Sequence, residues 1–298
     1  MLALVLSLPA TVYAAETGKT FATPEAAVAA LTTAVNAKDR EILHSIFGSA
    51  VVDIENPDHV QAAGELQTFA AALTTTNRLV RESDDRCVLE IGTNAWPFPI
   101  PIVKQSDGQW FFDTKAGQEE VLNRRIGRNE LATLLSMRAY VEAQREYASR
   151  DRLGNEVLQY AQKFFSSPGL KDGLFWPANL DGEISPFGPL VAHAQAAGYG
   201  KPDTDAAPEP FHGYYFKILT RQGKHAPGGK YNYVINGNMI GGFALVAWPA
   251  EYGNTGIMTF IVNQQGRVYQ KDLGLKTGKL APAMKKYDPD STWQLSPD

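Results

Sequence analysis

Residues 243–271 read FALVAWPAEYGNTGIMTFIVNQQGRVYQK, and this stretch decides the fold of the C-terminal half. It contains three short runs rich in β-branched and aromatic residues, at 243–248, 259–263 and 268–271, and Gln265-Gly266 supplies a turn between the last two. A similar run, Tyr214 to Thr220, precedes them. Because the connections are short, we predict an antiparallel meander of four strands.

A long helical pattern precedes these strands. From Asn129 to about Phe165, apolar residues recur at helical spacing and form a broad stripe; they include Leu131, Leu134, Leu135, Val141, Ala143 and Tyr147. A sheet with one apolar face must bury that face, so we predict that this helix packs on the meander. Residues 117–127 are polar and predict a short joining helix, and residues 166–207 are rich in Pro and Gly and predict loops around a short helix at 189–197.

The residues before this helix predict a smaller unit. Thr23 is a good helix cap with Pro24 at the first helical position, and further helices are expected at 39–47 and 59–73. A strand is expected at 86–92, and residues 102–104 and 110–112 form a hairpin across Ser106-Asp107-Gly108. We therefore predict an α+β protein with two domains: a small helix-on-sheet domain at 21–127 and a helix-plus-sheet domain at 128–298.

The first fifteen residues have the composition of a signal peptide. Met1 to Leu8 is apolar, and Ala10 to Ala15 contains a small-residue cleavage site with Val12 and Ala14 in the A-x-A-like positions. The apolar run is too short to span a bilayer, and no cysteine follows it as a lipoprotein anchor would require. We expect a soluble mature protein that begins near Ala15 and is periplasmic or secreted.

Composition excludes several classes of function. With a net charge of −4 and an isoelectric point near 5.8, the chain has no electrostatic reason to bind nucleic acid. The single cysteine, Cys87, allows no internal disulfide and no thiolate zinc cage, and we expect it to be buried in the strand that it occupies.

Several motifs resemble a bacterial family of exported proteins, the domain-of-unknown-function family 2950. They are residues 124–130 (RRIGRNE), 173–177 (GLFWP), 185–190 (SPFGPL), 241–249 (GGFALVAWP), 256–263 (GIMTFIVN) and 268–274 (VYQKDLG). The likeness covers nearly all of the mature chain. It implies an envelope setting in a Gram-negative bacterium and assigns no activity.

The C-terminal half is also similar to the soluble domains of type IV pilins and type II secretion pseudopilins. The helix with Ala143-Gln144 and Tyr147, followed by an irregular loop and the strands from Tyr214 onward, carries this resemblance. It implies a pilin-like helix on a sheet. Pilins polymerise through a long apolar N-terminal helix that is absent at the matching place, so the resemblance does not extend to filament assembly.

No catalytic motif is present. The five histidines, residues 44, 59, 193, 212 and 225, form no H-x-x-H or H-E-x-x-H pattern, and no G-x-S-x-G occurs. His212 and His225 flank one strand, so an envelope hydrolase is an alternative function, with a site made from the loop Gly173 to Pro189 plus either histidine. We predict no catalytic residue and no cofactor.

Calcium is the metal that the sequence allows. Asp288-Pro289-Asp290 and Asp203-Thr204-Asp205 are D-x-D pairs, and neither continues into an EF-hand. The pseudopilin resemblance implies a calcium loop near the end of the sheet, where Asp288 and Asp290 lie, so a calcium-stabilised module is a second alternative.

The candidate binding residues are aromatic. Phe175 and Trp176 lie in a loop beside Pro177, and Tyr214 and Tyr215 begin the first strand of the meander; these four side chains are suited to line a ligand groove. Our interpretation is a non-catalytic binding or assembly component of the cell envelope with a protein partner there. It does not bind nucleic acid, and the mature chain does not span the membrane.

Overall fold

The computed structural model describes residues 17–178, 182–199 and 209–297, and the predicted signal peptide lies outside these ranges. The chain divides into two compact units. Unit 1 has two segments, the first ending at Glu55 and the second spanning Leu66–Val121. Unit 2 comprises Asn56–Glu65 and Leu122–Asp298. The segment 56–65 thus belongs to the unit formed mainly by the C-terminal half.

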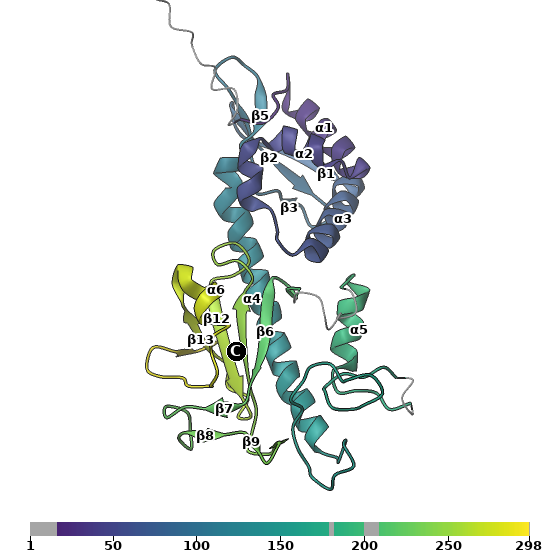
Figure 1. Ribbon diagram of the computed structural model, residues 1–298. Coiled ribbons are helices and arrows are strands. Elements are labelled where there is room, and N and C mark those ends of the chain that lie inside the picture. Colours follow the sequence, from purple (N-terminus) through teal and green to yellow (C-terminus); the bar gives the residue numbers. More distant parts are fainter. Residues whose placement is uncertain (1–16, 179–181, 200–208, 298) are drawn as a thin grey trace, which may run out of the picture. The chain divides into compact units, whose positions relative to one another are not determined.

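Unit 1 begins with capped helices, as its sequence predicts (Figure 1). Helix α1 (Pro24–Ala37) starts where Thr23 Oγ1 accepts a hydrogen bond from Ala26 N, 3.1 Å. Helix α2 (Arg40–Phe47) is capped by the Asp39 carboxylate and ends at Gly48, which has φ +75°. A 3₁₀ turn, η1 (Ser49–Ile54), follows, and α3 (His59–Thr75) has its first seven residues in unit 2.

The sheet of unit 1 is antiparallel. It consists of β1 (Asn77–Ser83), β2 (Arg86–Ile91), β4 (Ile102–Lys104) and β5 (Trp110–Phe112) in that order, with β3 (Trp96–Pro97) paired to β2. The hairpin across 106–108 and the burial of Cys87 are confirmed. Strand β1 was not expected, because most of its residues are exposed and polar and it lacks an apolar alternation.

One continuous helix, α4 (Thr114–Ala148), replaces the short and long helices expected from the sequence. It begins where the Asp113 carboxylate accepts a hydrogen bond from Ala116 N, and the glycine at 127 does not interrupt it. The expected end at Phe165 is wrong. The Asp151 carboxylate accepts hydrogen bonds from the backbone N–H groups of residues 153, 154 and 156, and this capture starts a turn just after Ala148.

Residues 149–187 are irregular up to helix α5 (Gly188–Ala196). The main sheet of unit 2 has the order β14-β13-β12-β11-β6, and every pairing is antiparallel. Its strands are β6 (Tyr214–Leu219), β11 (Ala244–Pro249), β12 (Met258–Asn263), β13 (Tyr269–Asp272) and β14 (Gln294–Leu295). The predicted meander is therefore confirmed, with β14 as an added edge.

Two small hairpins connect β6 to β11. Strand β7 (Arg221–Gln222) pairs with β8 (Tyr231–Asn232), and β9 (Val234–Ile235) pairs with β10 (Asn238–Met239). Asn236 and Gly237 both have positive φ, 50° and 83°, as a type I′ turn requires. After β13, the turn η2 (Gly274–Lys276) and the short helix α6 (Thr277–Leu280) lead into the C-terminal segment.

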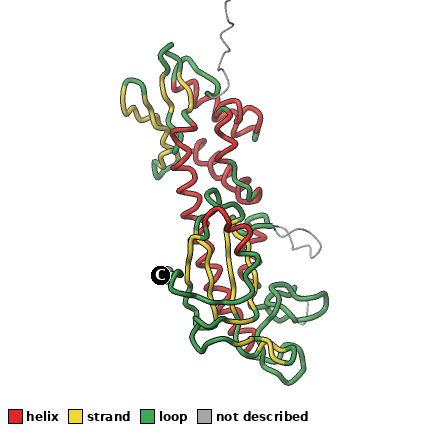
Figure 2. Tube along the Cα trace, turned by 60° about the vertical axis from the view of Figure 1, so that its left-hand side comes forward, coloured by secondary structure: helices red, strands yellow, loops and turns green. Residues whose placement is uncertain are grey.

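The core of unit 2 lies between α4 and the sheet (Figures 1 and 2). All six residues of β11 are buried. Tyr140 on α4 contacts the ring of Phe243 edge-on at 5.6 Å and donates to Ala244 O at 3.3 Å. The α+β class is thus confirmed. Among the described residues, no helix combines the length and the apolar character needed to cross a membrane.

Candidate functional site

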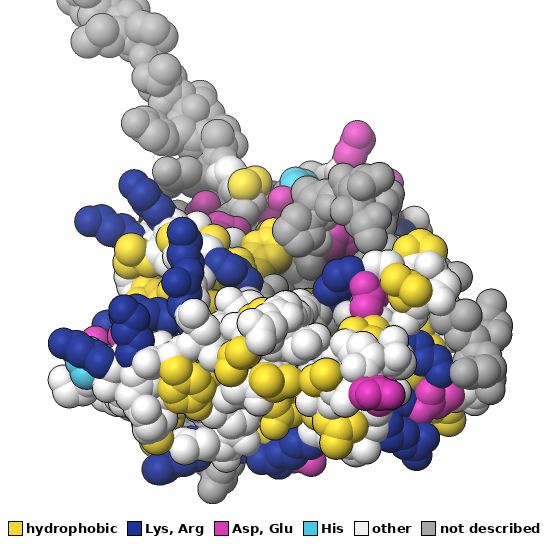
Figure 3. Space-filling model, turned by 60° about the horizontal axis from the view of Figure 1, so that its bottom comes forward, with side chains coloured by type: hydrophobic (Ala, Val, Ile, Leu, Met, Phe, Trp, Pro, Cys, Tyr) yellow, Lys and Arg dark blue, Asp and Glu magenta, His cyan; other side chains and the backbone are white. Residues whose placement is uncertain are grey.

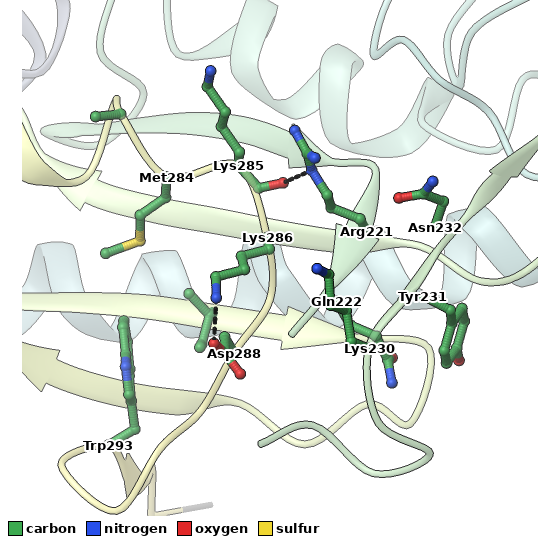
Figure 4. A pocket seen from close by; sticks show the side chains of 12 residues that line it. Arg221, Gln222, Lys230, Tyr231, Asn232, Met284, Lys285, Lys286, Asp288 and Trp293 are labelled. Carbon is green, nitrogen blue, oxygen red and sulfur yellow. Dashed lines mark hydrogen bonds and ion pairs between the residues drawn. The ribbon is translucent and has the colours of Figure 1, made fainter. Parts of the chain in front are cut away.

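A surface pocket of about 790 Å³ opens on unit 2, and we call it the C-terminal pocket (Figure 4). Its wall is formed by β7 and β8, one residue of β12, the segment 283–288 and Trp293. The lining residues are Arg221, Gln222, Lys230, Tyr231, Asn232, Ile261, Ala283, Met284, Lys285, Lys286, Asp288 and Trp293.

One wall is held rigid by a buried amide. Gln222 is 1% exposed, and its Nε2 donates to Pro227 O and Gly229 O, both at 2.7 Å. Its Oε1 accepts a hydrogen bond from the Tyr233 hydroxyl at 3.0 Å. These three bonds satisfy the amide and fix the loop between β7 and β8, which carries Lys230 at its end.

The opposite wall is tied to β7 by backbone hydrogen bonds. Gly223 N donates to Tyr287 O at 2.8 Å, and Tyr287 N donates to Arg221 O at 3.0 Å. A Cβ at Gly223 would collide with the Asp288 carboxylate in its present position, so glycine permits this close approach. Lys217 Nζ donates to Pro282 O and Met284 O, which anchors the start of the segment. The pocket is therefore a preformed feature of the fold.

The pocket carries an excess of positive charge. Arg221, Lys230, Lys285 and Lys286 line it, with Asp288 as the single lining carboxylate. In Figure 3, Lys and Arg side chains gather along the left-hand side of the view, with a histidine among them.

Asp288 is already engaged. It accepts from Lys286 Nζ at 2.7 Å (Figure 4). It also accepts from His225 N at 2.9 Å and lies 3.1 Å from His225 Nδ1. Although burial raises the pKa of Asp288, the hydrogen bonds from Lys286 and His225 hold it below its ordinary value. The carboxylate is ionised at neutral pH, and its charge is matched by Lys286.

The other three cations have no carboxylate partner among the described residues. Arg221 Nε donates to Lys285 O at 3.2 Å, which orients the guanidinium and leaves its two terminal nitrogens free of bonds to the described chain. The ammonium groups of Lys230 and Lys285 make no hydrogen bond or ion pair with any described residue. Three cations that repel one another around a preformed pocket favour binding of an anion.

Comparison with known proteins gives a family for the chain. The family described as "Protein of unknown function (DUF2950)" matches residues 18–295. The chain belongs to this family. No curated protein and no solved structure matches. The family carries no assigned activity, so the residues of the C-terminal pocket must be interpreted from their own chemistry.

Of the two predicted calcium ligands, Asp288 lines this pocket and Asp290 is not among the lining residues. Asp288 faces Lys286 and His225, and Asp290 Oδ1 accepts from the backbone and hydroxyl of Thr292. Across residues 17–178, 182–199 and 209–297, no group of three or more His, Cys, Asp or Glu side chains is placed to hold a metal. The second D-x-D pair, Asp203 and Asp205, lies outside the described residues. Calcium binding stays a prediction.

His212 lies in a different part of unit 2, near Asp58. The Asp58 side chain is 2% exposed; its Oδ1 accepts from Gln61 N, and its Oδ2 accepts from the Tyr199 hydroxyl at 2.7 Å and from Gly213 N at 3.0 Å. Three donors thus hold this carboxylate, which caps α3 and fixes the start of β6. Burial lowers the pKa of His212. The sequence gave no sign of these long-range partners of Asp58.

The four candidate aromatic residues do not form one surface. Trp176 and Tyr214 are core residues, 1% and 0% exposed. Their polar atoms are satisfied inside the core, since the Trp176 indole N–H donates to Glu183 O and the Tyr214 hydroxyl donates to Met258 O. Phe175 is half-buried against Phe165. Tyr215 is half-buried against Trp248. The aromatic side chains that line a pocket are instead Trp293 and Tyr231, and neither is among these four candidates.

The loop Gly173 to Pro189 packs onto the end of α4. Trp176 contacts the Tyr147 ring, and Arg152 lies over the Trp176 indole at 5.3 Å. The Glu183 carboxylate pairs with Arg152 and with Lys171. The described residues of this loop therefore stabilise a corner of unit 2 by packing and charge pairing.

Proposed function

We propose that this chain is an exported, non-catalytic binding component of the bacterial cell envelope, and that the C-terminal pocket holds its ligand. The observation that carries the proposal is a preformed pocket in which three of the four lining cations, Arg221, Lys230 and Lys285, have no carboxylate partner in the described chain. Like charges grouped around one pocket repel one another, and an anionic ligand relieves that repulsion.

Export is supported by the sequence of residues 1–15, with its apolar run and small-residue cleavage site. To test it, the full chain with a C-terminal tag is expressed in a Gram-negative host and the cells are fractionated. We expect the protein in the periplasmic or secreted fraction, with an N-terminus near Ala15. An uncleaved chain in the cytoplasm would contradict export.

A role without catalysis is supported by the state of the two acids near the histidines. Asp288 is matched by Lys286, and Asp58 is held by three donors, so each carboxylate already has a structural task. The competing proposal is an envelope hydrolase that uses His212 or His225. Ester, amide and glycoside substrates separate the two: turnover by the wild type that is lost in His212→Ala or His225→Ala would refute our proposal.

The pilin-like character of unit 2 is a proposal about fold. A helix against an antiparallel meander supports it. Filament assembly is not part of the proposal, since α4 carries charged residues throughout its length.

Ligand capture is tested with a variant that fills the pocket. Ala283 is exposed at the wall, so Ala283→Trp occupies the cavity without changing charge. Wild-type and variant proteins are immobilised and exposed to an envelope extract, and the retained small molecules are identified by mass spectrometry. We expect at least one component that the wild type retains and the variant does not. Retention of the same components by both proteins would refute binding in this pocket. A protein partner that docks elsewhere would be retained by both.

A further inference from the structure

We propose that the ligand of the C-terminal pocket is a phosphorylated sugar that carries at least two anionic groups. This inference rests on the proposed function, since it names the class of molecule that the same pocket takes. It is argued from the charges, the flat ring and the neutral polar groups that line the cavity.

The charges define the anionic part of the ligand. In Figure 4, Arg221 and Lys285 lie together on one side of the cavity, and Lys230 lies apart from them beside Tyr231. The free terminal nitrogens of Arg221 form a planar fork that matches two oxygens of a phosphate, and a lysine ammonium acts as a point charge. Two separated positive poles fit a ligand with two anionic groups better than a single ion.

The remaining lining groups define the body of the ligand. Trp293 lies on the side of the cavity opposite Lys230, with Lys286 between them in the view (Figure 4). An indole offers a flat apolar face to a ring. The amide of Asn232 is exposed in the wall and suits hydroxyl groups, which both donate and accept hydrogen bonds. A ring with apolar faces, hydroxyl groups and phosphates has all three properties.

The dimensions and charge of the pocket disfavour other ligands. A cavity of about 790 Å³ is in the range of sites for small molecules. A cation such as Ca²⁺ would face three unpaired positive charges. A neutral glycan would gain no ionic contact from those three exposed cations, which attract anions.

The experiment is isothermal titration calorimetry of the full mature protein with glucose 1,6-bisphosphate, inorganic phosphate and methyl glucoside. We expect the bisphosphate to bind most tightly, phosphate weakly and methyl glucoside not measurably. Affinity for the bisphosphate falls as salt is raised, because the contacts are ionic.

Variants assign the binding to the pocket. The double variant Lys230→Gln/Lys285→Gln removes two cations that have no partner in the described chain, so the fold should be unaffected. We expect its affinity to fall by about a hundredfold, on the basis of roughly tenfold for each of the two charge-assisted contacts. The matched control Lys38→Gln/Lys115→Gln removes two exposed lysines of unit 1 and gives the same net charge. Its affinity should stay within about twofold of the wild type.

Separate variants test the indole of Trp293 and the guanidinium of Arg221. Trp293→Ala should weaken the bisphosphate and leave phosphate unchanged, and Trp293→Phe should restore part of the loss. Arg221→Lys keeps the charge and removes the fork, so it should weaken both phosphorylated ligands.

Three results would overturn the inference. They are equal loss of affinity in the two double variants, methyl glucoside binding as tightly as the bisphosphate, and binding to phosphatidylglycerol vesicles without binding to the soluble bisphosphate. If the envelope extract yields an Ala283→Trp-sensitive ligand that is neutral or cationic, the inference fails and the proposed function stands. If no such ligand exists, the proposed function fails first.

Discussion

The irregular segment after α4 depends on one buried amide, and Gln144→Leu tests this directly. Gln144 is fully buried on α4. Its Nε2 donates to Ala161 O at 2.8 Å and to the Tyr140 hydroxyl at 3.0 Å, and its Oε1 accepts from Ala161 N at 2.8 Å. One side chain thus satisfies both backbone polar groups of a residue seventeen positions away, in the segment that lacks regular secondary structure.

The cost of the substitution follows from those bonds. Leucine has nearly the volume of glutamine, so it leaves little cavity. It does leave the N–H and C=O of Ala161, which is 1% exposed, without partners. Each orphaned buried group costs about 1–3 kcal/mol, so the free energy of unfolding of unit 2 should fall by about 2–6 kcal/mol.

Two measurements check this value. Urea unfolding gives the change in stability, and hydrogen exchange at the Ala161 amide reports the local bond, which matters because two units need not unfold together. Glu146→Gln, an exposed position of the same helix, is the control and should change stability by less than about 0.5 kcal/mol. If Gln144→Leu unfolds like the wild type and Ala161 exchanges no faster, the assignment of this contact is wrong.

Three further predictions concern unit 2. Burial lowers the pKa of His212 in the folded protein. Below the ordinary histidine pKa of about 6.5, the unfolded chain therefore binds more protons than the folded chain. The free energy of unfolding should fall as the pH is lowered through that value. His212→Asn, which tolerates the positive φ of this residue, should flatten that dependence in thermal melts at pH 5 to 8, and an equally steep profile would contradict it. A chelator should leave Tm unchanged, because Asp288 is already matched by Lys286; a fall in Tm would support the calcium module. Gly256→Ala should destabilise the protein by about 1–3 kcal/mol or more in urea, because the new Cβ collides with the buried Tyr214 hydroxyl, whereas Gly278→Ala, with open space around it, should not.

Much of the fold could be predicted because its signals are local. The caps at Thr23 and Asp39, the hairpin turn at Asn236-Gly237 and the strand runs of the meander are each encoded within a few residues. Helix α4 was predicted with the wrong ends. Its apolar periodicity continues past Ala148, where the Asp151 carboxylate accepts backbone hydrogen bonds and starts a turn instead. Strand β1 was missed, since pairing with β2 stabilises it in the absence of an apolar pattern.

The candidate site could not be predicted in the same way. Trp176 and Tyr214 are aromatic residues that a sequence suggests for a groove, and only packing shows that they are core residues. Asp288 was singled out as a calcium ligand on its position in the chain, yet its charge is matched by a lysine two residues before it. Spacing identified neither Trp293 nor the unpaired lysines as lining one cavity.

The sequence by itself determined that the chain is α+β, that a helix and a meander form its C-terminal half, that Cys87 is buried and which family the chain resembles. Those properties follow from periodicity, turn chemistry and motif identity, which act over short distances along the chain. Only the tertiary structure decided that Arg221, Lys230 and Lys285 surround one pocket. Lys285 lies more than fifty positions from Arg221 and Lys230, so the three charges have no sequence signature as a group. Backbone pairing of Tyr287 with β7 brings Lys285 to the other two.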